Sequence, residues 1–128
     1  MTSPRAIAIL GLVASALCAP ASGQSLLNFG GDTPLVCRVR LAAAPAGADS
    51  LGRVTEFCNG AKGYEVWADY PASLADSSLL VDGKQIPLSK SGSTRIDRSN
   101  RPAVVVKDVA LSPKDGAAGD VSFRIVAL

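Results

Sequence analysis

The sequence predicts a small all-β domain closed by one disulfide. Short segments alternate between apolar and polar residues with a period of two, and no segment shows a convincing helical period. Gly, Pro, Asp and Ser separate these segments about every ten residues. The expected strands are residues 35–41, 52–58, 64–70, the two arms of 79–88, 94–96, 104–111 and 121–128. Such spacing is typical of an immunoglobulin-like β-sandwich, with or without its last strand, or of a small barrel.

Residues 1–23 have the pattern of a secretory signal and are set apart from the fold. A short start with one positive charge, Arg5, precedes an apolar run over residues 6–19. Small residues follow, so cleavage is expected after Ala21 or Gly23. The run is shorter than the about 20 residues of a membrane-spanning helix, so a retained anchor is the alternative that we disfavour. We therefore expect an exported chain with no transmembrane segment after cleavage.

The remaining chain divides into an N-terminal extension, residues 24–34, and a β-sandwich domain, residues 35–128. Signal cleavage removes Cys18 and leaves Cys37 and Cys58. An even pair of cysteines in an exported domain predicts a disulfide, and two free buried thiols are the alternative. Closing a loop of about 20 residues stabilises the fold by roughly 3 kcal/mol in the chain-entropy model.

Residues 79–88 contain the strongest local signal for a hairpin. Asp82-Gly83 lies between two apolar runs, which favours a tight turn with positive φ. Pro87 lacks an amide hydrogen, so we expect the second arm at a sheet edge or near a bulge.

The residue inventory predicts a protein that is not an enzyme and carries neither a cofactor nor a metal. There is no histidine, which removes the usual general base and metal ligand. No nucleophile elbow or phosphate loop is present. Most of the acidic residues are expected to be solvated in turns or on polar strand faces, among Glu56, Glu65, Asp69, Asp76, Asp82 and Asp97. The net charge of +2 falls close to neutral without Arg5, so nucleic acid is not an expected partner.

Trp67 stands apart from the apolar face of its strand. Alternation places Tyr64, Val66 and Tyr70 on one face and Trp67 on the other. If that second face is covered, Trp67 is part of a core or half-buried; if it is open, Trp67 is a candidate contact for a partner.

Three short motifs together resemble subunits of chaperone–usher fimbriae, the surface pili of Gram-negative bacteria. The motifs are Leu27-x-Phe29-x-Gly31 ahead of Cys37-x-Val39, then Leu51-Gly52-x-Val54-x-Glu56-x-Cys58-Asn59, then Gly63-Tyr64-x-Val66. The chain departs from the family in being short and in lacking a tyrosine near its C-terminus, where Val121 and Phe123 stand.

The resemblance implies a sandwich that lacks its last strand and a function in fimbrial assembly and cell adhesion. Its partners would be a periplasmic chaperone, an outer-membrane usher and neighbouring subunits, and its location the periplasm and then the cell surface. A strand donated by the next subunit would fill the gap by β-augmentation, with Leu27, Phe29 and Gly31 on one side of that strand. The bland alternative for this segment is a loose terminal tail.

Two further classes of function stay open on the sequence. One is a self-contained periplasmic or secreted β-sandwich that binds protein or carbohydrate. The other is an enzyme or, more plausibly, an enzyme inhibitor. A self-contained sandwich would possess all its strands, whereas a fimbrial subunit would expose an edge that a neighbour completes.

Overall fold

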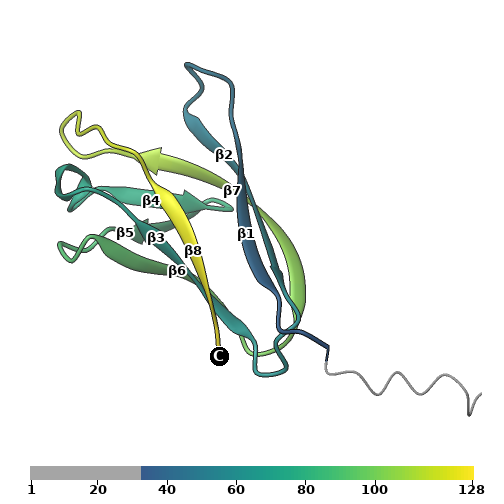
Figure 1. The fold of residues 1–128 in the computed structure, drawn as a ribbon. Helices are drawn as coiled ribbons and strands as arrows, with labels where there is room; N and C mark the ends of the chain where they lie inside the picture. The colour runs from purple at the N-terminus through teal and green to yellow at the C-terminus, as the bar shows by residue number, and fades with distance from the viewer. Residues whose placement is uncertain (1–32) are drawn as a thin grey trace, which may run out of the picture. The chain divides into compact units, whose positions relative to one another are not determined.

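The computed structural model describes residues 33–128, which fold as two antiparallel sheets (Figure 1). The five-stranded sheet has the order β1 (Cys37–Ala43), β2 (Ser50–Cys58), β7 (Ala103–Ser112), β4 (Ser78–Val81), β5 (Lys84–Pro87). The three-stranded sheet has the order β6 (Ser93–Ser99), β3 (Tyr64–Asp69), β8 (Ser122–Ala127). One turn of 3₁₀ helix, Ala72–Leu74, connects β3 to β4.

The predicted fold class is confirmed: the domain is an all-β sandwich with one disulfide. Placing β1, β2, β7 and β4 in one sheet, with β3 and β8 in the other, is the strand order of an immunoglobulin-like sandwich. Some predicted boundaries are wrong. β1 begins at Cys37, so Leu35 lies before the strand and is 62% exposed, and β6 covers Ser93–Ser99 where only a short strand was expected.

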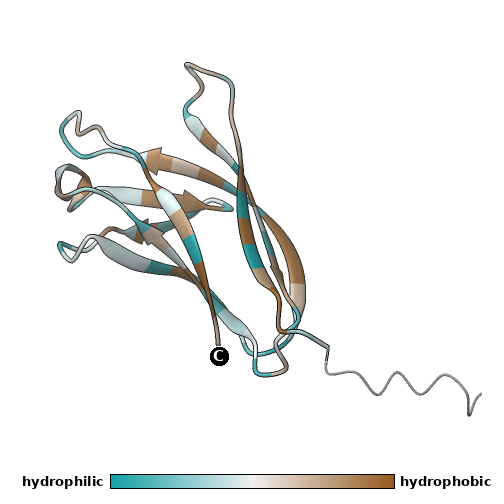
Figure 2. Ribbon diagram, in the orientation of Figure 1, coloured by the Kyte–Doolittle hydropathy of each residue, from teal (hydrophilic) through white to brown (hydrophobic). Residues whose placement is uncertain are grey.

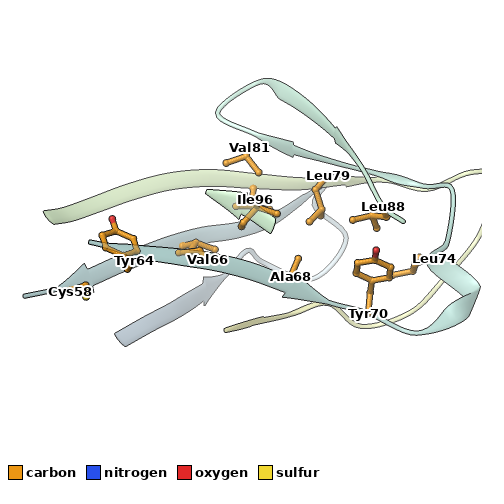
Figure 3. Close-up of a cluster of buried hydrophobic side chains, with 12 residues drawn as sticks. Cys58, Tyr64, Val66, Ala68, Tyr70, Leu74, Leu79, Val81, Leu88 and Ile96 are labelled. Carbon is orange, nitrogen blue, oxygen red and sulfur yellow. The ribbon is translucent and has the colours of Figure 1, made fainter. Parts of the chain in front are cut away.

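The core fills the space between the sheets with side chains from alternate positions. Tyr64, Val66 and Ala68 of β3 are fully buried and, with Tyr70, point toward Leu79, Val81, Leu88 and Ile96 in Figure 3. Apolar and polar segments follow one another along the strands in Figure 2, as the period of two requires. The predicted inward faces of residues 52–58 and 64–70 are confirmed, with Val54 and Cys58 buried.

The predicted hairpin is also confirmed. β4 and β5 pair around Asp82 and Gly83, which have φ of 48° and 79°. Positive φ at both central residues is the requirement of a type I′ turn. Pro87 ends β5, which is an edge strand of its sheet, so its missing amide hydrogen breaks no ladder.

Several expectations fall outside residues 33–128. The signal over 1–23 and the candidate donor residues Leu27, Phe29 and Gly31 belong to the part of the chain that the structure does not describe. Across 33–128, no helix is both long and apolar enough to cross a membrane.

Candidate functional site

One side of the sandwich brings together two strand edges that have no partner strand within residues 33–128. β8 pairs with β3 alone, and no strand within residues 33–128 pairs with its other edge. In the described part of the chain, β1 is likewise the outermost strand of its sheet and pairs only with β2. The two strands lie close to each other although they belong to different sheets, and Figure 1 shows both (β8 yellow, β1 dark blue). Unpaired edges present backbone N–H and C=O groups that can bind a further strand.

The inward-facing side chains along this side are apolar but incompletely covered. Val39 of β1 and Phe123 and Ile125 of β8 are half-buried, and Leu41 is 38% exposed. Their strand partners on the same faces are fully buried, such as Val66 opposite Ile125. We call these two strands, with Val39, Leu41, Phe123 and Ile125, the β1–β8 edge. It combines the backbone and the apolar side chains that an added strand would contact.

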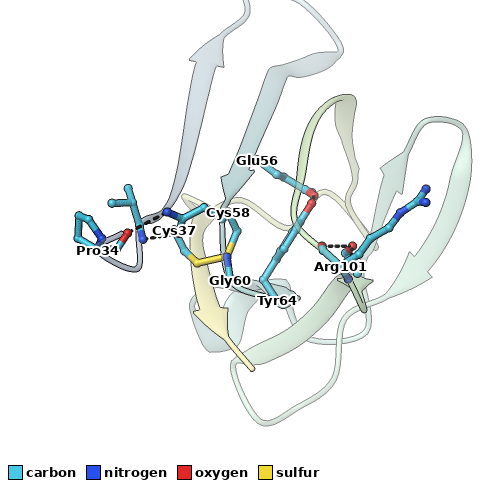
Figure 4. The surroundings of a disulfide bond; sticks show 10 residues. Pro34, Cys37, Glu56, Cys58, Gly60, Tyr64 and Arg101 are labelled. Carbon is cyan, nitrogen blue, oxygen red and sulfur yellow. Dashed lines mark hydrogen bonds between the residues drawn. A yellow bond between two sulfur atoms is a disulfide. The ribbon is translucent and has the colours of Figure 1, made fainter. Parts of the chain in front are cut away.

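The predicted disulfide fixes one end of this edge. Cys37 and Cys58 occupy opposite positions of β1 and β2 and are bonded to each other (Figure 4). Asn59 holds the chain just before β1: its Oδ1 accepts the Val36 N–H at 2.7 Å, and its Nδ2 donates to the Pro34 carbonyl at 2.8 Å. The start of β1 is therefore tied covalently and by hydrogen bonds to the end of β2.

Gly63 sets the close approach between the start of β3 and the end of β6. Its φ is +91°, and a Cβ at this position would lie 2.0 Å from the Ser99 carbonyl oxygen. Only glycine avoids both the left-handed strain and this collision. The fold of the domain itself therefore explains why glycine precedes Tyr64, and no partner is needed to account for it.

A polar cluster lies inside the sandwich, and it corrects an expectation. Glu56 was expected on a solvated face, but its side chain is fully buried and accepts a hydrogen bond from the Tyr64 hydroxyl at 3.1 Å (Figure 4). Lys107 of β7 also points inward and forms an ion pair with Asp97. Its Nζ also lies 3.9 Å from Glu56 Oε1. These four residues, the Glu56 cluster, link β2 and β7 of one sheet to β3 and β6 of the other.

Burial and charge shift the pKa values in this cluster in opposite directions. Burial, together with Asp97, raises the pKa of Glu56 to about 7. Burial and the neighbouring Glu56 raise the pKa of the Tyr64 hydroxyl. Burial alone would raise the pKa of Asp97, but its contacts with Lys107 and Glu56 outweigh that effect and lower it. Near neutral pH, Glu56 is thus close to its titration midpoint, while Asp97 is ionised beside Lys107.

The alternation of inward and outward positions along the strands could have identified Glu56 and Lys107 as inward-facing residues. Glu56 has the same parity as Val54 and Cys58, and Lys107 the same parity as Val109. Strict alternation places both inward, but their charge argues for solvent, and the sequence does not show that they meet.

Trp67 lies half-buried on the outer face of the three-stranded sheet, as its parity predicts. Its Nε1 donates to Glu65 Oε2 at 3.3 Å, and the Arg124 guanidinium lies over its ring, 5.7 Å from the centroid. Hydrogen bonds from Arg95 lower the pKa of Glu65, and those from Arg124 and Ser93 lower the pKa of Asp69. This face therefore satisfies its own charges, and a role for Trp67 in partner binding stays a prediction.

The arrangement offers strand pairing at the β1–β8 edge. Within residues 33–128, no three His, Cys, Asp or Glu side chains are grouped so that they could hold a metal ion. Comparison with protein-family models, with curated proteins and with solved structures finds no match.

Proposed function

We propose that the protein is an exported structural subunit of a fimbria-like assembly, in which a neighbour donates the strand that completes the β1–β8 edge. The observation that carries this proposal is the outer edge of β8, which has no partner within residues 33–128 and lies beside half-buried apolar side chains. In a complete immunoglobulin-like sandwich a further strand occupies this position beside the last one. Its absence leaves both backbone groups and apolar surface for a partner.

The candidate donor is the extension of another copy or of a different subunit. Leu27, Phe29 and Gly31 fall on one side of an extended strand, at the spacing of alternate pockets. Backbone hydrogen bonds to β8 would supply affinity, and apolar side chains covering Phe123 and Ile125 would supply specificity. Before assembly, a periplasmic chaperone would have to cover the same edge, and an outer-membrane usher would bring the subunits together.

Substitutions in the extension test the proposal. Phe29→Asp should block polymer formation and leave the domain folded, because an unpaired carboxylate would be buried in the neighbour at a cost of several kcal/mol. Gly31→Leu should have the same effect by overfilling its pocket. Lys62→Asp is the control, since Lys62 is exposed in the turn between β2 and β3 and should leave assembly unchanged. Electron microscopy and size-exclusion chromatography of surface material, with chaperone and usher co-expressed, measure the outcome.

Two results would contradict the proposal. If Phe29→Asp unfolds the monomer, the segment belongs to the protein's own sheet, and the self-contained binding module is correct. If wild-type material never assembles, even with chaperone and usher supplied, the fimbrial function is wrong.

A further inference from the structure

The two outer faces of the sandwich differ in whether their arginines have carboxylate partners. On the three-stranded sheet, Arg95 and Arg98 lie 2.8 and 3.6 Å from Glu65 Oε1, and Arg124 lies 3.1 Å from Asp69 Oδ2. Each of these arginines has a carboxylate partner in the domain. That face therefore leaves no arginine of its strands for an acidic partner.

The outer face of the five-stranded sheet has the opposite character near β1. Arg38 and Arg40 are exposed on β1, and neither forms an ion pair with any of residues 33–128. Among the residues that the structure describes, the one ion pair on this face joins Arg53 to Asp108, at 3.3 Å. Two cationic groups, two positions apart on one strand, thus have no counter-charge from residues 33–128.

Apolar side chains lie directly beside these arginines. Phe57 of β2 is opposite Arg38 in the strand register, and Val104 of β7 is opposite Phe57. Val104 is 67% exposed, and Val106 is 53% exposed. A shallow hollow in this face is lined by Val36, Arg38, Arg40, Thr55, Phe57 and Val104. Exposed apolar groups gathered in one patch and rimmed by charge are a mark of an interaction surface.

We propose that this arginine–valine face, formed by Arg38, Arg40, Phe57, Val104 and Val106, docks an acidic, extended segment of a partner protein. Charge complementarity identifies the occupant, because Arg38 and Arg40 have no carboxylate partner within residues 33–128 and can bind those of an acidic segment. Their side chains point the same way from positions two apart, a separation of about 7 Å along a strand. Alternate residues of an extended partner have the same spacing, so two carboxylates of one segment can meet both guanidinium groups.

Apolar side chains of the same segment fill the hollow that Phe57 and Val104 line. An aromatic or aliphatic side chain there would cover surface that is now exposed to water. This face uses the outward positions of β1, whereas the β1–β8 edge uses the inward ones, Val39 and Leu41. The inference therefore does not depend on the proposed assembly and holds for a self-contained binding module as well.

Nuclear magnetic resonance titration of the ¹⁵N-labelled mature chain tests this surface. The probe is the peptide Glu-Ser-Glu-Ser-Leu-Ser-Leu-Ser, whose glutamates and leucines lie on the same side when it is extended, and the same peptide with lysine in place of both glutamates is its charge-reversed match. The glutamate peptide should shift the amides of Arg38, Arg40, Phe57 and Val104, and the lysine peptide should not. Arg38→Glu combined with Arg40→Glu should weaken binding at least tenfold, because two attractions become repulsions.

Lys90→Glu is the matched control, since Lys90 is an exposed cation in the turn between β5 and β6, away from this face, and should leave the affinity unchanged. Equal binding of both peptides, or undiminished binding by the double variant, would overturn the proposal. So would shifts confined to β8, or binding of phosphatidylglycerol vesicles without binding of the glutamate peptide.

Discussion

Glu56 is the residue whose environment departs most from the rest of the core. Its carboxyl group is fully buried, and Oε1 has no hydrogen-bond partner within residues 33–128. The ionised form is therefore disfavoured, although Lys107 lies 3.9 Å away, because Asp97 already binds that ammonium group. The protonated form keeps the hydrogen bond from Tyr64 and adds no charge to the core.

This environment predicts that stability falls between pH 5 and pH 8. The pKa of Glu56 rises from 4.5 to about 7 on folding, so the folded state binds the proton more tightly than the unfolded state. That contribution is complete below about pH 4.5 and is lost as the pH rises through about 7. A shift of this size corresponds to about 3 kcal/mol. Glu56→Gln cannot titrate, so its free energy of unfolding should fall much less over the same interval when measured by urea unfolding at pH 5 and pH 8.

Glu65→Gln is the control for this experiment. Glu65 lies on the outer face, where Arg95 lowers the pKa of its carboxyl, so the variant should keep the wild-type decline between pH 5 and pH 8. An identical decline in wild type and Glu56→Gln would show that Glu56 is ionised in the folded state throughout this range.

At the scale of residues, the sequence predicted which side of a strand each side chain faces better than it predicted which residues that side chain contacts. Alternation placed Tyr64, Val66 and Trp67 on their observed faces, because side chains of a strand point alternately to opposite sides. It did not predict that Glu56 and Lys107 share the interior, because their contact depends on which strands become neighbours. That pairing is a property of the whole sheet.

At the scale of elements, β1 depends on the disulfide more than any other strand does. β1 pairs with β2 alone, and Cys37–Cys58 joins the two strands at one end. Cys37→Ser or Cys58→Ser should therefore reduce the free energy of unfolding by about 2–5 kcal/mol. In the native oxidised protein, both thiols should resist alkylation until a reductant is added. Mass spectrometry of the alkylated protein measures this, and ready labelling without reductant would contradict the disulfide.

The elements themselves were largely predictable, but their lengths were not. The Asp82-Gly83 turn and the alternation around it predicted the β4–β5 hairpin, because turn chemistry and period are local. The length of β6 was underestimated from the sequence. Its residues form a strand because they pair with β3, from Tyr64↔Ser99 to Asp69↔Ser93. Leu35 was assigned to β1, but the clamp by Asn59 holds the chain there in a non-strand conformation.

At the scale of the whole molecule, the order of strands within each sheet could not be predicted from the sequence. The strand arrangement leaves one edge of β8 without a partner in residues 33–128, and its register with β3 determines which amides that edge presents. The Leu128 N–H donates to the Gly63 carbonyl at 3.0 Å. In an antiparallel pair, hydrogen-bonded positions recur every second residue. Arg124 and Val126 should therefore also donate toward β3, and the amides between them point outward.

Hydrogen exchange of the isolated chain should consequently alternate along β8. The amides of Phe123, Ile125 and Ala127 should exchange rapidly, because they face the edge that no strand within residues 33–128 covers, while those of Arg124 and Val126 are protected by β3. Adding a peptide with the sequence of residues 24–33 should slow the exchange of the first set and leave the second set unchanged, since a donated strand binds only the outer edge. A peptide with aspartate in place of Phe29 is the control and should protect neither set. If Phe123, Ile125 and Ala127 are already protected in the dilute monomer, the chain fills this edge itself, and the donated strand is excluded.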